Sequence, residues 1–138
     1  GEVDRRSLGG KVFGNPERLK KLTDIVWPAI MRTAEQEIAS AKAENLNRVV
    51  VLEAAVLIEA DWLSLVDQVW VTVVEPSVAI ERASARDGVD AAAIQARIDA
   101  QLSNEERIAK AHDVIHNSGD QDHLIEQLRQ LWAGISAA

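Results

Sequence analysis

Apolar side chains recur at helical spacing through the first 45 residues. Residues 4–13 hold apolar positions four apart, which predicts a short helix. Asn15 and Pro16 then mark the start of a longer helix, because Asn caps a first turn well and Pro fits the first helical position. The apolar stripe continues past Pro28 to about residue 45, through Leu19, Leu22, Val26, Ile30, Met31, Ala34, Ile38 and Ala41.

Beyond residue 45 the pattern changes to short, continuous apolar runs. Residues 48–52 and 66–74 are rich in β-branched side chains and predict two strands buried on both faces. Residues 113–116 form a shorter strand candidate, which is followed by a turn at 117–119.

Helical patterns lie between and after these runs. One helix should begin at Pro76 and end at Gly88, since glycine is a common helix stop. Asp90 can cap the next helix, and the capping-box spacing of Ser103 and Glu106 starts another. Strands that alternate with helices predict an α/β fold with a parallel sheet. A final amphipathic helix carries Leu124, Leu128, Leu131, Trp132 and Ile135 on one face.

Composition narrows the classes of function. The 138 residues suffice for one domain, and a net charge of −7 argues against a broad grip on nucleic acid or on an anionic membrane. The longest apolar stretch, 49–58, contains Glu53 and is far shorter than the ~20 residues of a membrane span. There is no cysteine, and the three histidines lack thiolate partners, so we expect no zinc site and assign no metal ligand in this sequence.

Three arginines provide the first candidate chemistry. Arg82 and Arg86 are four residues apart and share a helix face, while Arg97 lies on the polar side of the next helix. Guanidinium groups on two consecutive helices could cover a polyphosphate, because they pair bidentately with phosphate oxygens. A solvated surface is the simpler interpretation of the spacing alone.

Polar residues at predicted strand ends are further candidates. Asn117, Ser118 and Gly119 follow a strand at the edge where parallel sheets bind ligands, although the same tripeptide is good turn chemistry. Glu53 and Glu59 flank the end of the first predicted strand, where carboxylates often hold a magnesium-bound water or an acceptor group. Neither glutamate need be buried.

Six sequence blocks occur in a fixed order along the chain. They are D-R-R-S-L-G-G-K-V-F (4–13), L-K-K-L-T-D-I-V-W-P-A-I (19–30), V-V-V-L-E-A-A-V-L-I-E (49–59), I-E-R-A-S-A-R-D-G (80–88), A-R-I-D-A-Q (96–101) and D-V-I-H-N-S-G (113–119). Their order and gaps resemble the dephospho-coenzyme A kinase family over essentially the whole chain. The resemblance is greatest to the kinase domain of the bifunctional coenzyme A synthase.

Two positions depart from the usual family pattern. Most single-function members have His-Pro where this sequence has Trp27-Pro28, which favours the synthase-like branch. The family's equivalent of the 48–52 strand usually ends in Asp where this chain has Glu53, and the longer side chain leaves a direct role for this glutamate open.

The resemblance implies a fold and a reaction. The fold would be that of P-loop kinases of the nucleoside monophosphate kinase type, a parallel sheet with a helical acceptor-binding region. The reaction would be ATP-dependent phosphorylation of the ribose 3′-hydroxyl of dephospho-coenzyme A, with Mg²⁺ bridging the ATP phosphates. The protein would be cytoplasmic, or its parent would lie in the mitochondrial matrix.

The resemblance also assigns regions and site residues within a single partial kinase domain. Residues 1–45 would bind the acceptor, residues 46–75 and 112–138 would form the core, and residues 76–111 would form a lid that closes over the phosphates. The implied site residues are Arg82, Arg86 and Arg97 as catalytic, phosphate-facing lid groups; Asn117, Ser118 and Gly119 at the nucleotide; and Arg5, Leu8, Phe13 and Glu59 at the acceptor.

The family's phosphate loop is expected upstream of this sequence. The motif G-x-x-x-x-G-K-[ST] occurs nowhere in the 138 residues, and in the family it precedes the block that starts here at residue 4. Family strands run in the spatial order 2-3-1-4-5, and this sequence would supply only strands 3, 4 and 5. Strand edges would then stay unpaired, so we expect the chain alone to be inactive or self-associated.

Two other classes of function remain compatible with the sequence. One is a non-catalytic module, derived from a kinase, that binds a coenzyme A-like ligand or a partner. The other is a small-molecule kinase of the nucleoside monophosphate type, which would share the fold and differ in its acceptor.

Overall fold

The computed structural model describes residues 2–12 and 14–136. The chain divides into two compact units, a first within residues 1–65 and a second within residues 66–138. Over the described residues, helices predominate and a small parallel sheet lies in the second unit. No helix in the described part of the chain is long and apolar enough to cross a membrane. The predicted assignment of acceptor, core and lid regions stays a prediction.

The first unit is built on two helices, α1 (Arg5–Val12) and α2 (Pro16–Glu44). Asn15 caps α2 as predicted, because its Oδ1 accepts a hydrogen bond from the backbone N–H of Arg18 at 3.0 Å. Gly14 precedes this cap with φ of 85°, a conformation that favours glycine. The helix runs through Pro28 without interruption.

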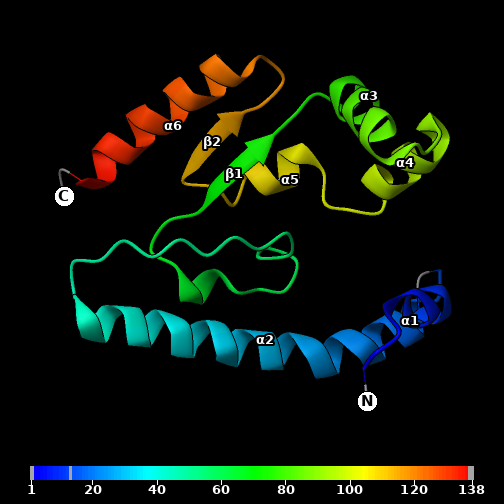
Figure 1. Cartoon of the computed structure of the whole chain (residues 1–138), viewed down its shortest axis with the longest axis horizontal. Helices are drawn as coiled ribbons and strands as arrows, with labels where there is room; N and C mark the ends of the chain where they lie inside the picture. The colour runs from blue at the N-terminus through cyan, green and yellow to red at the C-terminus, as the bar shows by residue number, and fades with distance from the viewer. Residues whose placement is uncertain (1, 13, 137–138) are drawn as a thin grey trace. The chain divides into compact units, whose positions relative to one another are not determined.

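A segment without regular secondary structure returns along α2 and leads to the short helix η1 (Leu63–Leu65), as Figure 1 shows. Trp62 anchors this segment, since it is only 4% exposed and meets Trp27 edge to face with ring centroids 6.3 Å apart. The stripe predicted for α2 is thus partly covered, with Met31, Ala34, Ile38 and Ala41 half-buried.

The prediction of a strand at residues 48–52 is wrong for this structure. These residues have no regular secondary structure, and Val49, Val50 and Val51 are 41%, 36% and 75% exposed. A strand needs a partner for its backbone N–H and C=O groups, and the only ladder among the described residues joins two other segments. The β-branched run therefore has the composition of a strand without its pairing.

The second unit contains two parallel strands, β1 (Trp70–Val73) and β2 (Asp113–His116). Both were predicted, although β1 is shorter than the run at 66–74. Their register pairs Trp70 with Asp113 and Val73 with His116. The buried core of this unit comprises Val69, Val71, Val73, Ile94 and Ile115.

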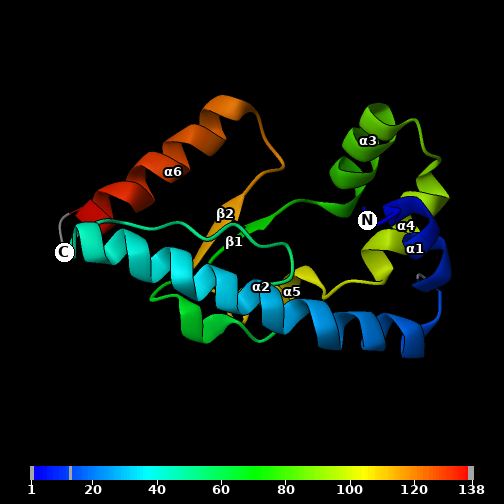
Figure 2. The ribbon, with the colours of Figure 1, turned by 60° about the horizontal axis from the view of Figure 1, so that its bottom comes forward.

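Side chains close the ends of this sheet. His112 begins the ladder through two hydrogen bonds to Val69. Its side-chain Nδ1 accepts from the backbone N–H of Val69 at 2.9 Å, and its backbone N–H donates to the carbonyl of Val69. At the other end, Gln127 bonds both backbone groups of His116: its Oε1 accepts from the N–H at 2.9 Å, and its Nε2 donates to the carbonyl at 2.8 Å. Gln127 belongs to α6 (Gln121–Ser136), which lies beside β2 in both Figures 1 and 2.

Two helices follow β1 and pack against each other, α3 (Pro76–Asp87) and α4 (Ala91–Asp99). The predicted boundaries are confirmed: Gly88 ends α3 in the left-handed conformation with φ of 65°, and Asp90 caps α4 by accepting from the N–H of Ala93 at 2.8 Å. Ile94 is the buried residue of α4.

The short helix α5 (Asn104–Ile108) connects α4 to the second strand. Its capping box is confirmed, with the N–H of Ser103 donating to Glu106 Oε2 at 2.8 Å. This backbone N–H, followed by the Ser103 hydroxyl, lowers the pKa of Glu106. Asn104 fixes α5 to the sheet by donating to the carbonyl of Val74 at 3.1 Å.

Candidate functional site

The turn of Asn117, Ser118 and Gly119 lies at the carboxyl ends of both parallel strands, as predicted. The N–H of Asn117 donates to the carbonyl of Val73 at 2.8 Å, which extends the ladder by one bond. The hydroxyl of Ser118 accepts from the N–H of Glu75 at 2.9 Å. The turn is therefore bonded to the connection between β1 and α3, at the edge where parallel sheets bind ligands.

Arg82 brings α3 to this turn. Its Nη1 donates to the carbonyl of Asn117 at 2.6 Å, and its Nη2 donates to the carbonyl of Gly119 at 2.8 Å. A third, longer bond joins Nη1 to Asn117 Oδ1 at 3.3 Å. Because a guanidinium is a planar fork of donors, two carbonyls two residues apart fix its orientation.

Arg86 and Arg97 meet at one carboxylate, that of Asp87. Arg86 binds it through two hydrogen bonds, from Nε at 2.7 Å and from Nη2 at 3.0 Å. Arg97 approaches from α4, with Nη1 at 3.7 Å from Asp87 Oδ2. The structure thus brings two of the three predicted arginines to one carboxylate, and their role at a phosphate stays a prediction.

The contact between Arg86 and Asp87 shifts the pKa of both groups. The hydrogen bond from Arg86 lowers the pKa of Asp87, and the positive charges of Arg86 and Arg97 lower it further. The same contact raises the pKa of Arg86. Both arginine side chains remain largely exposed, so an incoming phosphate could replace the carboxylate as their partner.

The residues predicted at the acceptor side lie in the first unit. Arg5 and Leu8 belong to α1, and Glu59 lies half-buried in the turns at 55–61. Phe13 falls outside the described residues. Glu53, whose role the sequence left open, is exposed. A joint role for these residues stays a prediction.

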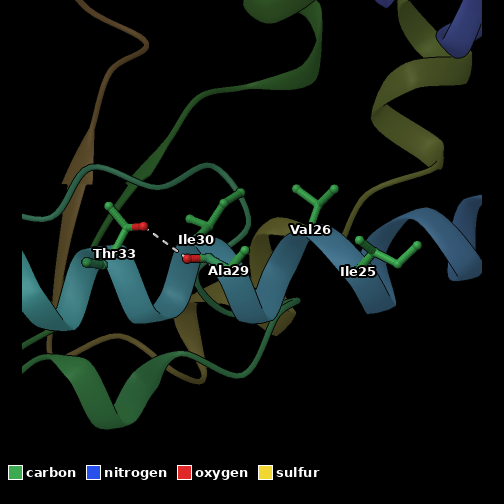
Figure 3. A pocket seen from close by; sticks show the side chains of 6 residues that line it. Ile25, Val26, Ala29, Ile30 and Thr33 are labelled. Atoms are coloured by element: carbon green, nitrogen blue, oxygen red, sulfur yellow. Dashed lines mark hydrogen bonds between the residues drawn. The ribbon is translucent and has the colours of Figure 1, made fainter. Parts of the chain in front are cut away.

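The first unit also has two hollows beside α2. One, of about 290 Å³, lies next to the Trp27 and Trp62 rings. The other is an open apolar groove of about 500 Å³ on α2 itself, where Figure 3 shows Val26, Ile30 and Thr33 projecting to the same side. The Thr33 hydroxyl donates to the backbone carbonyl of Ala29 at 3.1 Å, so its hydrogen is already used within α2. The other residues that line the groove are apolar.

Two features of the site were not predicted from the sequence. Asp87 was interpreted as part of a helix stop and as an acidic neighbour on a solvated surface, and not as the shared partner of Arg86 and Arg97. The bonds of Arg82 to the turn were also missed, because they join residues 35 and 37 positions apart. Such contacts depend on how α3 packs and leave no local signal in the sequence.

Within the described residues, no group of three or more His, Asp or Glu side chains could hold a metal ion.

Comparison with known proteins relates this chain to a family. The sequence profile of the family described as dephospho-CoA kinase matches residues 1–123. A dephospho-CoA kinase from Geobacter sulfurreducens is 35% identical over 133 residues, which are 96% of this chain and 67% of that protein.

Solved structures agree in fold. A crystal structure from Thermus thermophilus matches with a TM-score of 0.78 and 30% identity, over 97% of this chain and 68% of that one. The dephospho-CoA kinase from Campylobacter jejuni matches with a TM-score of 0.63 and 24% identity, over 96% of this chain and 67% of that one.

The chain spans between 55% and 67% of the length of the first curated relatives that it matches. Over that span it has the P-loop kinase fold of its structural relatives, and it is homologous to phosphotransferases. The chain belongs to the dephospho-CoA kinase family.

Proposed function

We propose that this chain is the acceptor-binding and lid portion of a kinase that phosphorylates the ribose 3′-hydroxyl of dephospho-CoA with ATP. One observation carries the proposal. Arg86 and Arg97 converge from two helices on a single carboxylate, and Arg82 of the same helix is bonded to the turn at the carboxyl end of the sheet. The chain thus holds two exposed cations near a turn suited to a nucleotide.

Arg86 and Arg97 would stabilise the transferred phosphoryl group. In this reaction the acceptor hydroxyl gives up its proton to a base and its oxygen bonds to the γ-phosphorus, while the bond from that phosphorus to the β–γ bridging oxygen breaks and ADP leaves. Charge on the transferring group is stabilised by nearby cations rather than by covalent chemistry. Asp87 would hold both guanidinium groups in place until the phosphates bind.

The nucleotide and the acceptor would bind at different parts of the chain. Asn117, Ser118 and Gly119 would contact the adenine of ATP. Arg5, Leu8, Phe13 and Glu59 would contribute to binding dephospho-CoA.

Two components of the reaction are expected outside this sequence. The G-x-x-x-x-G-K-[ST] phosphate loop is absent from the 138 residues, and the relatives are longer than the part of them that the chain spans. We infer that the rest of the protein supplies this loop, together with most of the ligands of the Mg²⁺ that accompanies ATP. The 138-residue chain alone should then be inactive.

A finer assignment rests on Trp27, which stands before Pro28 where most single-function relatives have histidine. We propose that the protein belongs to the branch that resembles the kinase domain of bifunctional coenzyme A synthase. The cytoplasm, or the mitochondrial matrix for the parent protein, is the expected location.

The test is an assay of the complete protein and of the 138-residue chain with ATP, Mg²⁺ and dephospho-CoA. We expect the complete protein to form ADP and coenzyme A in equal amounts, detected by liquid chromatography and mass spectrometry, and the chain alone to form neither. In the complete protein, Arg86→Gln and Arg97→Gln should each lower kcat by about 100-fold, as expected for loss of a group that stabilises transition-state charge.

Arg129→Gln is the matched control, because Arg129 is an exposed arginine of α6 that pairs with Glu126 at 3.8 Å. It should leave kcat unchanged. Binding of dephospho-CoA without any phosphorylation by the complete protein would contradict the proposal and favour a non-catalytic binding module. Phosphorylation of a nucleoside monophosphate in place of dephospho-CoA would identify a different kinase.

A further inference from the structure

We propose that Arg82 is a positioning residue, which acts on the nucleotide through the 117–119 turn and does not contact the transferred phosphoryl group. The inference deepens the proposed function and rests on it for the identity of the ligand. It separates Arg82 from Arg86 and Arg97, with which the sequence pattern grouped it.

The first argument is the set of partners. All the acceptors of Arg82 belong to the turn: two main-chain carbonyls at 2.6 and 2.8 Å and one side-chain oxygen at 3.3 Å. Arg86, by contrast, has a carboxylate partner, which a phosphate can replace because both are anions. Displacing Arg82 would instead leave carbonyls of the turn without their charged donor.

The second argument is the way in which the turn is held on its other sides. The hydroxyl of Ser118 accepts from the N–H of Glu75, directly before α3, and the N–H of Asn117 donates to β1. Together with the bonds of Arg82, these contacts join three successive turn residues to α3 and β1. The position of the turn therefore depends on the position of α3.

A mechanical consequence follows for nucleotide binding. A base that binds at the turn would meet a preformed surface, since the carbonyls of Asn117 and Gly119 are already oriented by one guanidinium. Without that guanidinium the turn would have to be ordered at the moment of binding, which weakens affinity. Chemistry at the phosphates would be affected little.

Two variants separate charge from geometry. Arg82→Lys keeps the charge but cannot bridge two carbonyls with a planar fork, whereas Arg82→Gln removes the charge as well. Arg129→Gln again serves as the control for loss of an exposed arginine in the same unit.

The first measurement is amide hydrogen exchange of the complete protein without nucleotide. Arg82→Gln should speed exchange at the amides of Glu75 and Asn117 by about tenfold or more, as expected when bonds to a charged donor are lost. Arg82→Lys should give a smaller increase. The amide of Ile115, inside β2, should change little, and Arg129→Gln should change none of the three.

The second measurement is the division of the kinetic effect between KM and kcat. Arg82→Gln should raise the KM for ATP about tenfold and leave kcat within about twofold of wild type, with Arg82→Lys between the two. Arg86→Gln should lower kcat and change the KM for ATP little.

Two results would overturn the inference. Unchanged exchange at Glu75 and Asn117 would show that Arg82 does not hold the turn. A fall in kcat with an unchanged KM would show that Arg82 acts at the phosphoryl group. A wild-type protein without kinase activity would refute the proposed function instead, and the exchange comparison would still decide whether Arg82 holds the turn.

Discussion

Asp87 is the shared partner of two exposed arginines, Arg86 and Arg97. Its carboxylate accepts two hydrogen bonds from Arg86 and lies 3.7 Å from Arg97. A carboxylate between the two guanidinium groups offsets their mutual repulsion, so they can lie close together. Under the proposed function, Asp87 would compete with the phosphates of ATP for both arginines.

This contact predicts a change in the titration of Asp87. Because the hydrogen bond from Arg86 lowers the pKa of Asp87, Arg86→Gln should raise that pKa. Carboxyl carbon NMR of the labelled chain measures it directly. Arg129→Gln should leave the titration unchanged, and an unchanged titration in Arg86→Gln would contradict the contact.

The sign of the pH effect on stability follows from the lowered pKa. A carboxylate whose pKa is lower in the native than in the unfolded state stabilises the native state at every pH above its unfolded pKa. This stabilisation is lost as the pH falls through its native pKa. The Asp87 pair should therefore persist throughout the neutral range and disappear only in strong acid. Exposure of the pair keeps its contribution to stability small.

At the scale of elements, helix ends could be predicted from sequence and strand pairing could not. Asn15, Gly88, Asp90 and Ser103 all occupy the caps expected of them, because a cap is a contact between residues at most four apart. The run at 48–52 has the composition of a strand, but pairing depends on a partner distant in sequence. The contact between Arg82 and the 117–119 turn could not be foreseen for the same reason.

The cap of α2 gives a stability prediction. Asn15→Ala removes the acceptor for the N–H of Arg18 and should lower the free energy of unfolding by about 1 kcal/mol. Urea unfolding followed by circular dichroism at 222 nm provides the measurement. Asn47→Ala, an exposed asparagine outside any helix, should change it by less than about 0.5 kcal/mol. Equal losses in both variants would show that the cap contributes nothing specific.

At the scale of the whole molecule, the first unit has a strand-forming sequence without a ladder. Val49, Val50 and Val51 are exposed, and among the described residues no backbone hydrogen bond to their N–H groups is present. The resemblance to the family implies a further strand beside this run. We propose that residues 49–51 pair with such a strand in the complete protein.

Hydrogen exchange can test this interpretation of the first unit. In the 138-residue chain, the amides of residues 49–51 should exchange at nearly the rate of an unfolded peptide, whereas those of Val71 and Val73 should be protected. In the complete protein, the amides of residues 49–51 should be protected from exchange as well as those of Val71 and Val73. Slow exchange at 49–51 in the short chain would mean that this run pairs already, within one molecule or between two.

Gln127 has a consequence for behaviour at high protein concentration. By bonding both the N–H and the carbonyl of His116, its side chain occupies the place that a neighbouring strand would take at that end of β2. An unprotected edge is a template for aggregation, and natural sheets blunt such edges with polar groups. We therefore expect Gln127 to hinder the addition of a strand at the His116 end of β2.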